Sequence, residues 1–465
     1  MAYVAQPGSF RDPSGRVFIK DGGVFRTVTA HAREAYVLVR DSGLLEDLAR
    51  RGWLVESVEV DPAVLGASAR EARYVLEHPA IPYVSFPYEW CFPALKAAAL
   101  LHLDLHFEAL ERGATLSDAS AYNVQFRGAR PVFIDVLSLR PYREGELWVG
   151  HRQFCEQFLN PLLLRARLGI PHNAWYRGSL EGIPTAELAR LLPLRAKLSW
   201  HVLTHVVLQA RLHERAMRRP SESIEKARAG RLSRAGLQGL LSQLRRWIAR
   251  LQPADRGTTV WGDYASTHSY SSSEESAKRR IVSEFVERTR PRLLLDLGCN
   301  TGDYAALALE SGAQRVIGFD FDQRALESAF TRAEARGLDF LPLFLDATNP
   351  SPDQGWRQAE RSGFAGRAKA DGLLALAFEH HLTIGRNVPL DQAIAWITAQ
   401  APRGVIEFVP KDDPTMRRML ALREDIFPDY DEVAFTRCLA EVARIVRREV
   451  VSEDGRCLFW YERSR

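Results

Sequence analysis

The stretch from Arg292 to Asp322 constrains the fold more than any other part of the chain. It reads RLLLDLGCNTGDYAALALESGAQRVIGFDFD, in which an apolar run ends in Asp296 and a loop with Gly298 and Gly302 follows. An alanine- and leucine-rich segment then leads to a second apolar run, which ends in Asp320. This order of strand, glycine loop, helix and strand predicts one right-handed βαβ unit of a parallel sheet.

The glycine loop has the pattern of a ligand site at the carboxyl end of a strand. Glycine has no Cβ, so the backbone takes positive φ values and approaches a ligand closely, and we expect the neighbouring N–H groups to stay free for that ligand. Asp320, at the end of the next strand, is placed to accept hydrogen bonds from ribose hydroxyls. The spacing D-x-G-x-x-x-G lacks the close glycine pair that brings a backbone onto a pyrophosphate, and Asp296 favours a cationic ligand.

These residues resemble the motif of S-adenosylmethionine-dependent methyltransferases of the seven-stranded Rossmann-like class. In that family the residues that match Asp296, Gly298 and Gly302 surround the methionine part of the cofactor. The acid that matches Asp320 holds the ribose, and the acid of a third strand end, here Asp346, meets the adenine amino group. The resemblance implies S-adenosyl-L-methionine as the cofactor, bound by Asp296, Gly298, Cys299, Asn300, Gly302, Asp320, Phe321, Asp346 and Ala347.

Three polar residues follow a fourth apolar run. Ala370 to Phe378 is predicted to be a central strand, and Glu379-His380-His381 comes directly after it. Because open α/β sheets bind their ligands at the carboxyl ends of the strands, we expect Glu379, His380 and His381 at the catalytic site. A histidine has an unperturbed pKa near neutrality and could remove the acceptor's proton; the alternative is that both histidines only support the fold.

Six further residues are candidates for binding the methyl acceptor. Four precede the first strand of the sheet, where a segment can cover a site as a lid, and two lie in and after a fifth predicted strand, Gly404 to Val409. The six are Trp261, Tyr264, His268, Tyr270, Glu407 and Lys411. The alternative for the aromatic residues is packing on the outer layer of the domain. Glu407 lies within an apolar strand, so it is either hydrogen-bonded internally or part of the acceptor pocket.

The N-terminal half contains a second motif, in the stretch TLSDASAYNVQFRGARPVFIDVLS from Thr115 to Ser138. Asp118 and Asn123 precede a predicted hairpin, and Asp135 follows it. This order resembles the catalytic loop and metal-binding acid of kinase-like phosphotransferases. In that family the residues matching Asn123 and Asp135 hold magnesium, and the one matching Asp118 orients the hydroxyl that is phosphorylated.

The second motif also departs from the kinase-like pattern. No histidine lies two residues before Asp118, no glycine lies two residues after Asp135, and the chain has no glycine-rich nucleotide loop. Lys20 is the only early candidate for a strand lysine. A degenerate kinase-like scaffold, in which the acids and Asn123 cap turns, is therefore the alternative to an active phosphotransferase.

The length of 465 residues predicts two or three domains. We expect an α+β domain with kinase-like features over residues 1–170 and a helical segment that packs with it over residues 171–255. Residues 256–465 are expected to form an α/β Rossmann-like methyltransferase domain of seven strands. The first domain is predicted to begin with a hairpin over Gly15 to Val28 and a helix over Ala32 to Arg51. The helical segment is predicted to contain one long helix over Ala186 to Arg219.

Charge, cysteines and apolar runs exclude several classes of protein. The net charge of +4 is spread along the chain, which argues against nucleic acid as a partner, and no apolar run has the length of a membrane span. Five cysteines without a C-x-x-C pair predict neither disulfides nor a zinc site. His201, His205 and His213 share a helical face, but no acid or further histidine lies at ligand spacing, so no metal site is predicted. We expect a cytoplasmic location.

The whole chain resembles a group of bacterial proteins that includes a rhizobial nodulation protein, in its two-part arrangement and in strings such as IEFVPKDDP and REDIFPDY. The function predicted is methyl transfer from S-adenosylmethionine to an oxygen or nitrogen nucleophile. The acceptor, which is a small molecule, a saccharide or a protein, and the oligomeric state stay open. The alternatives are a phosphotransferase centred on Asp118, Asn123 and Asp135, and a non-catalytic scaffold with a vestigial cofactor domain.

Overall fold

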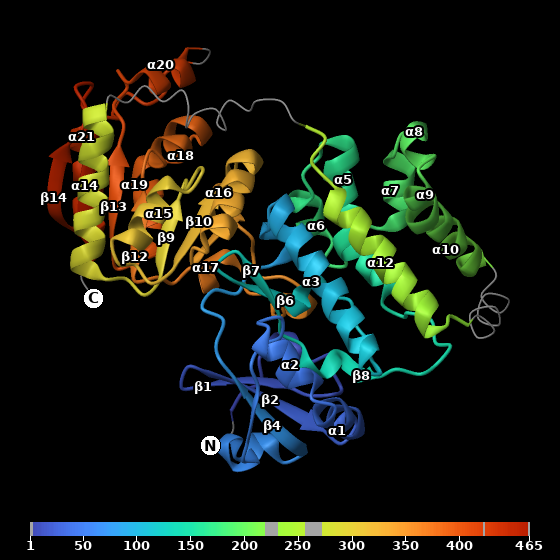
Figure 1. The fold of residues 1–465 in the computed structure, drawn as a ribbon. Coiled ribbons are helices and arrows are strands. Elements are labelled where there is room, and N and C mark those ends of the chain that lie inside the picture. The colour runs from blue at the N-terminus through green and yellow to red at the C-terminus, as the bar shows by residue number, and fades with distance from the viewer. Residues whose placement is uncertain (1–2, 219–230, 256–271, 422–423, 464–465) are drawn as a thin grey trace. The chain divides into compact units, whose positions relative to one another are not determined.

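The chain forms two compact units. The structure is a computed structural model that describes residues 3–218, 231–255, 272–421 and 424–463 (Figure 1). The N-terminal unit contains residues 1–126, 130–256 and 353–361. The C-terminal unit contains residues 127–129, 257–352 and 362–465.

The N-terminal unit begins with a four-stranded antiparallel sheet of order β1-β2-β4-β3, formed by β1 (Val17–Lys20), β2 (Gly23–Thr29), β3 (Val58–Val60) and β4 (Ala72–His78). β1 and β2 form the predicted hairpin, and Asp21 and Gly22 turn the chain with φ values of 50° and 82°. Two residues with positive φ suit the right-handed twist of a hairpin. Phe18, Phe25 and Val75 are buried in one cluster on this sheet.

Two helices replace the single helix predicted over Ala32 to Arg51. They are α1 (Arg33–Asp41) and α2 (Leu44–Arg50). Gly43 lies between them with a φ of 73°, a left-handed conformation that ends a right-handed helix. The spacing of the leucines is helical on both sides of this residue, so periodicity alone did not reveal the break.

The N-terminal unit contains a long, largely buried helix, α3 (Phe92–Glu111). It leads through β5 (Ala114–Leu116) to a hairpin of β6 (Val124–Arg127) and β7 (Arg130–Phe133), and β5 pairs with β8 (Leu139–Pro141). α12 (Arg234–Arg250) packs along α3, where Lys96 Nζ donates to the carbonyl of Leu251 at 3.0 Å. The short 3-10 turns of the unit are η1 (Pro7–Ser9), η2 (Pro62–Leu65), η3 (Ala67–Ala69), η4 (Pro87–Glu89), η5 (Ala121–Asn123), η6 (Val136–Ser138) and η9 (Trp356–Gln358).

The helices that follow β8 are short and include two π-helical segments. They are α4 (His151–Phe154), the π-helix η7 (Cys155–Leu159), α5 (Asn160–Leu168), α6 (Asn173–Gly178), α7 (Thr185–Leu191), α8 (Leu194–Lys197), α9 (Trp200–Val202), the π-helix η8 (Leu203–Val207) and α10 (Leu208–Arg218). The prediction of one long helix over Ala186 to Arg219 is therefore wrong. Pro193 is one reason, because proline has no N–H to continue a helical ladder.

The C-terminal unit is built on one seven-stranded sheet of order β11-β10-β9-β12-β13-β15-β14, with helices around it in Figure 1. The first five strands of this order are parallel, and β15 and β14 are antiparallel to their neighbours. The strands are β9 (Leu294–Leu297), β10 (Val316–Asp320), β11 (Phe340–Phe344), β12 (Gly372–Ala375), β13 (Arg403–Phe408), β14 (Arg444–Val450) and β15 (Cys457–Glu462). All residues of β9 and β12 are buried, as expected of central strands covered on both faces.

The helices of the C-terminal unit alternate with the parallel strands. They are α14 (Ser272–Thr289), α15 (Asp303–Glu310), α16 (Gln323–Arg336), α17 (Phe364–Arg367), α18 (Glu379–Arg386), α19 (Leu390–Ala399), α20 (Pro414–Leu420) and α21 (Glu432–Val442). The order reverses between β9 and β12, because β10 lies on one side of β9 and β12 on the other. Such a reversal is the place where open α/β sheets bind ligands.

The fourth predicted strand is shorter than expected. It spans Gly372–Ala375 instead of Ala370 to Phe378, because Ala377 has a φ of 47° and the chain then enters α18 at Glu379. Among the described residues, the structure contains no helix that is both long enough and apolar enough to span a bilayer.

Candidate functional site

The loop between β9 and α15 is shaped by three residues with left-handed backbone conformation. Gly298, Asn300 and Gly302 have φ values of 78°, 47° and 81°. A Cβ on Gly302 would lie 2.5 Å from the ring of Phe340, and one on Gly318 would lie 2.8 Å from the sulfur of Cys299. The loop is therefore packed tightly on β10 and β11, and Cys299 fills the space above Gly318.

Four amides of the loop are already engaged within the protein, so the expectation that the amides beside the glycines stay free for a ligand is wrong for Cys299. The amides of Gly298 and Cys299 both donate to the carbonyl of Phe319, at 2.8 and 3.0 Å. The amide of Asn300 donates to Oδ2 of Asp320 at 2.8 Å, and that of Gly302 to the carbonyl of Cys299 at 2.8 Å. These bonds fix the loop before a ligand arrives.

What the loop offers to a ligand is a set of hydrogen-bond acceptors. Oδ2 of Asp296 and Oδ1 of Asn300 are buried and accept no hydrogen bond from any residue that the structure describes. Burial, followed by the nearby carboxylates of Asp320 and Asp303, raises the pKa of Asp296 to about 7. A buried acceptor without a donor costs free energy, which a cationic or hydrogen-bond-donating ligand would recover.

Asp320 holds the loop and remains at the strand end. Its Oδ1 accepts the amide of Asp322 at 2.8 Å, while Oδ2 accepts that of Asn300. Burial raises the pKa of Asp320, and the backbone hydrogen bonds oppose this shift. Phe321, next to it, is 56% exposed with its ring 5.6 Å from that of Phe344, so it offers an aromatic face beside the acid.

The third strand end has the predicted position beside the second. β11 pairs with β10 in parallel, and the amide of Leu345 donates to the carbonyl of Asp320 at 2.9 Å. Asp346 and Ala347 follow at once and are half-buried. Oδ1 of Asp346 accepts from the hydroxyl of Thr348 at 2.7 Å, which fixes the carboxylate at the edge of the sheet.

Glu379, His380 and His381 lie in the first turn of α18 rather than at the end of an extended strand. Both oxygens of Glu379 are engaged, one by the hydroxyl of Thr383 and one by that of Tyr430 at 3.0 Å. Burial raises the pKa of Glu379 to about 7. Glu379 therefore anchors α18, and its catalytic role stays a prediction.

The two histidines lie side by side with ring centroids 4.2 Å apart. His380 is buried, and its Nδ1 has no hydrogen-bond partner within the described ranges. Burial lowers the pKa of both rings, that of His381 to about 4, so both are neutral at pH 7. A neutral imidazole has a lone pair that can accept a proton.

Glu407 is the centre of a buried charge network. It is fully buried in β13, with Oε1 2.6 Å from Lys278 Nζ and 3.1 Å from Arg456 Nη1. Its Oε2 accepts the amide of Ala377 at 2.9 Å, and Arg456 also pairs with Asp413 at 2.7 Å. Of the two alternatives for Glu407, these contacts support the internal one. The network ties β13 to the turn that leads into α18.

The remaining candidates for acceptor binding are less clearly placed. Lys411 pairs with Asp425 at 2.8 Å and also donates to the carbonyl of Phe427, so it fixes the loop after β13. The other four candidates fall outside the described residues: Trp261, Tyr264, His268 and Tyr270.

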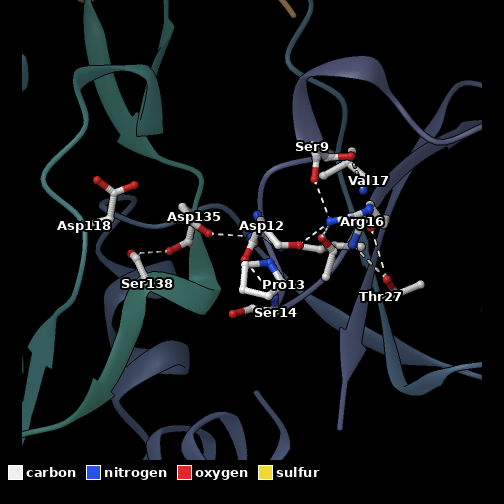
Figure 2. Close-up of polar contacts among 12 residues, drawn as sticks. Ser9, Asp12, Pro13, Ser14, Arg16, Val17, Thr27, Asp118, Asp135 and Ser138 are labelled. Atoms are coloured by element: carbon white, nitrogen blue, oxygen red, sulfur yellow. Dashed lines mark hydrogen bonds and ion pairs between the residues drawn. The ribbon is translucent and has the colours of Figure 1, made fainter. Parts of the chain in front are cut away.

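The N-terminal unit brings its three motif residues together. Nδ2 of Asn123 donates to Asp118 at 3.1 Å and to Asp135 at 3.3 Å. Arg26 on β2 pairs with Asp135 at 2.9 Å and with Asp12. Figure 2 shows Asp12 facing Asp135, with Asp118 on the neighbouring segment.

The segment around Asp12 is itself held in place. Its carboxylate accepts the amide of Ser14 at 2.8 Å, and the hydroxyl of Ser9 accepts that of Val17 at 3.1 Å (Figure 2). Burial raises the pKa of Asp135, Arg26 opposes this shift, and the charges of Asp118 and Asp12 add to it. Sequence reasoning missed Arg26 and Asp12, because both lie more than ninety residues before Asp118.

The strand order and the acceptor-lined loop define the C-terminal unit as a Rossmann-like domain of the S-adenosylmethionine-dependent methyltransferase class. No protein-family model matches the chain. Over 457 residues it is 47% identical to nodulation protein NoeA of Rhizobium meliloti (strain 1021), an alignment that covers 98% of this chain and 96% of that protein. The chain belongs to the family of NoeA.

Two further comparisons concern parts of the chain. Over 64 residues it is 39% identical to ribosomal protein L11 methyltransferase of Photobacterium profundum, which covers 14% of this chain and 22% of that protein. Among solved structures, N-methyltransferase NodS of Bradyrhizobium japonicum WM9 aligns with 41% of this chain and 97% of its own, at 16% identity and a TM-score of 0.31.

Proposed function

We propose that this chain transfers the methyl group of S-adenosylmethionine to an oxygen or nitrogen nucleophile. The observation that supports this most is the lining of the glycine loop. The amides of Gly298, Cys299 and Asn300 are engaged internally there, and buried oxygens of Asp296 and Asn300 are left without a donor. Phosphate ligands need donors. A sulfonium, an ammonium group, ribose hydroxyls and an adenine amine all need acceptors or negative charge instead.

The residues present fit such a ligand in three places. Asp296 would neutralise its cationic methionine part, Asp320 would accept from the ribose hydroxyls, and Asp346 would accept from the adenine amine. Gly298 and Gly302 supply the backbone turn that these contacts need. The same loop and strand ends contribute the other proposed cofactor contacts, Cys299, Asn300, Phe321 and Ala347.

S-adenosylmethionine supplies a methyl group that is already activated as part of a sulfonium. The protein's own task is then to align the nucleophile in line with that group and to exclude water. Alignment can lower a barrier by roughly 7–11 kcal/mol, so a strong base is not required. His380 and His381 are the proposed acceptors of the nucleophile's proton, since both rings are neutral at pH 7.

Separate His380→Ala and His381→Ala variants test the proposed base. If one of the two histidines takes the proton, its variant lowers kcat by roughly 10²–10⁴-fold and leaves cofactor affinity unchanged. His213→Ala, an exposed histidine on α10, is the matched control. Full kcat in both variants would assign the histidines a purely structural role.

The acceptor is proposed as a small molecule, a saccharide or a protein, with Trp261, Tyr264, His268, Tyr270 and Lys411 as candidate contacts. Glu407 is engaged by Lys278 and Arg456, so its proposed role is to hold one wall of the site in position. The test is to incubate purified protein and radiolabelled S-adenosylmethionine with cell extract and then to separate the protein, polysaccharide and small-molecule fractions. The fraction that contains the label identifies the class of acceptor. Asp320→Ala should transfer none, and equal labelling by both proteins would reject the assignment.

A second candidate function is magnesium-dependent phosphotransfer in the N-terminal unit. It is favoured by the hydrogen bonds of Asn123 to both Asp118 and Asp135. Titration of the protein with ATP and Mg²⁺ tests it, with Asp135→Asn as the variant that should lose binding. If the protein binds no nucleotide, the three residues serve the fold, and the scaffold alternative applies to this unit.

A further inference from the structure

A cluster of two histidines and one cysteine, none of them a residue of the Asp118, Asn123 and Asp135 motif, lies in the N-terminal unit. One nitrogen of His151, the sulfur of Cys155 and one nitrogen of His205 all lie within 4.8 Å of one another. His151 Nε2 is 3.2 Å from His205 Nδ1 and 3.7 Å from Cys155 Sγ. Cys155 and His205 are buried, and His151 is half-buried. From this geometry we propose that these three side chains bind one transition-metal ion of the zinc type.

The two separations from His151 Nε2 match those of a metal site. Zinc lies about 2.0–2.1 Å from histidine nitrogen and about 2.3 Å from cysteine sulfur in a tetrahedral arrangement. Those lengths place two nitrogens about 3.3 Å apart, and a nitrogen and a sulfur about 3.6 Å apart. The observed 3.2 and 3.7 Å agree with these values, and the third separation, between His205 and Cys155, is no more than 4.8 Å.

The backbone around the cluster is unusual on both sides. Cys155 begins the π-helix η7, and His205 is the central residue of the π-helix η8. π-helical turns are rare and are frequently found at functional sites. Two such turns that face each other through the proposed ligands are a second, independent observation in favour of a built site.

The type of donor decides the class of ion. Two imidazoles and one thiolate suit zinc, cobalt and copper, while magnesium and calcium need oxygen ligands. Trp148 packs edge-on to His151, with ring centroids 5.6 Å apart, and Trp247 stacks on His205 at 6.0 Å. Three protein ligands leave a fourth position for water or a small ligand.

Binding at this cluster would join two helical segments that are fifty residues apart in the chain, from Cys155 to His205. The folded chain holds the three donors together, and the unfolded chain does not, so the ion would stabilise the N-terminal unit by mass action. This inference does not depend on methyl transfer, because it concerns only residues of the N-terminal unit.

Cobalt is the probe for the test. Full-length protein is treated with a chelator, and Co²⁺ is then titrated while thiolate-to-cobalt charge-transfer absorbance is followed. We expect an absorbance band that saturates at one ion per chain and disappears when Zn²⁺ is added. No band with the wild-type protein would overturn the proposal, and this result does not depend on how any variant folds.

Variants assign the band to the cluster. Cys155→Ser and His205→Ala should lose the band and the rise in Tm that Zn²⁺ produces in the wild-type protein. Cys438→Ser and His213→Ala, which replace a cysteine of α21 and an exposed histidine of α10, should keep both. A band that persists in Cys155→Ser, or one that Cys438→Ser removes, would place the ion elsewhere and reject the site.

Discussion

Asp296 lies in the central strand β9, 2% exposed, with one oxygen that accepts no hydrogen bond from the described residues. Its pKa is raised from the ordinary 3.8 to about 7. The folded chain therefore holds a proton that the unfolded chain has already lost, and stability falls as pH rises between these two values. Binding of the proposed cationic cofactor beside Asp296 would recover this cost.

The first prediction follows from that shift. Asp296→Asn keeps the shape but has no charge, so it should raise the free energy of unfolding more at about pH 8 than at about pH 5, by a few kcal/mol. The same variant should lose affinity for S-adenosylmethionine. Urea unfolding at both pH values measures the first effect. A variant that is less stable than wild type at the higher pH would contradict the pKa argument.

Glu407 gives the second prediction at this scale. Glu407→Gln leaves Lys278 and Arg456 buried without their shared carboxylate, which should cost about 3–5 kcal/mol of unfolding free energy. Asp412→Asn removes an exposed partner of Arg417 and should change stability by less than about 0.5 kcal/mol. Chemical denaturation compares the two. Equal effects would mean that the buried network contributes no more than a surface pair.

At the scale of elements, the turn from β9 into α15 is the most sensitive. Gly302→Ala would force a Cβ to within 2.5 Å of Phe340 at a φ of 81°, so it should destabilise the C-terminal unit by more than about 1 kcal/mol and weaken cofactor binding.

The control for this glycine is Gly239→Ala in α12, where a Cβ meets nothing within 4 Å. Alanine suits a helix interior better than glycine, so this change should stabilise the protein by about 0.5–1 kcal/mol. Thermal unfolding of both variants gives the comparison. The two substitutions are expected to change the stability of the protein in opposite directions. A Gly302→Ala variant that is more stable than wild type would contradict the described loop.

Elements with a strong local signal could be predicted from the sequence. The hairpin around Asp21-Gly22 and the loop from Asp296 to Gly302 are set by residues adjacent in the chain, and both are observed. The break at Gly43 and the end of β12 depend on single backbone torsions within apolar runs, which periodicity does not detect. Strand β4 was also missed, because its position is fixed by pairing with both β2 and β3 and not by a local pattern.

At the scale of the whole molecule, the contacts that sequence reasoning missed are those that join residues over long separations in the chain. Lys278 and Glu407 are 129 positions apart, and His151 and His205 are 54 positions apart. Asp12 and Arg26 meet Asp135 from a distant part of their unit's sequence. No local pattern marks such pairs, because only the folded chain brings them together.

The N-terminal unit also uses residues from the second half of the chain. In the segment 353–361, Gln354 Nε2 donates to the carbonyl of Arg177 at 2.8 Å, and the Arg361 guanidinium lies 4.4 Å from the centre of the Tyr122 ring. A fragment that ends at residue 255 lacks these contacts. It should unfold at a lower temperature than the same unit in the full chain, as differential scanning calorimetry can measure. An equal Tm would show that the segment adds nothing.

The central claim is that the C-terminal unit binds S-adenosylmethionine through its acidic strand ends. Isothermal titration of S-adenosylmethionine and of its demethylated product into the full-length protein and into Asp320→Ala tests it most directly. We predict one site per chain that the wild-type protein fills with micromolar affinity and that the variant loses while it remains folded. No binding to the wild-type protein, or equal affinity in both proteins, would contradict the account.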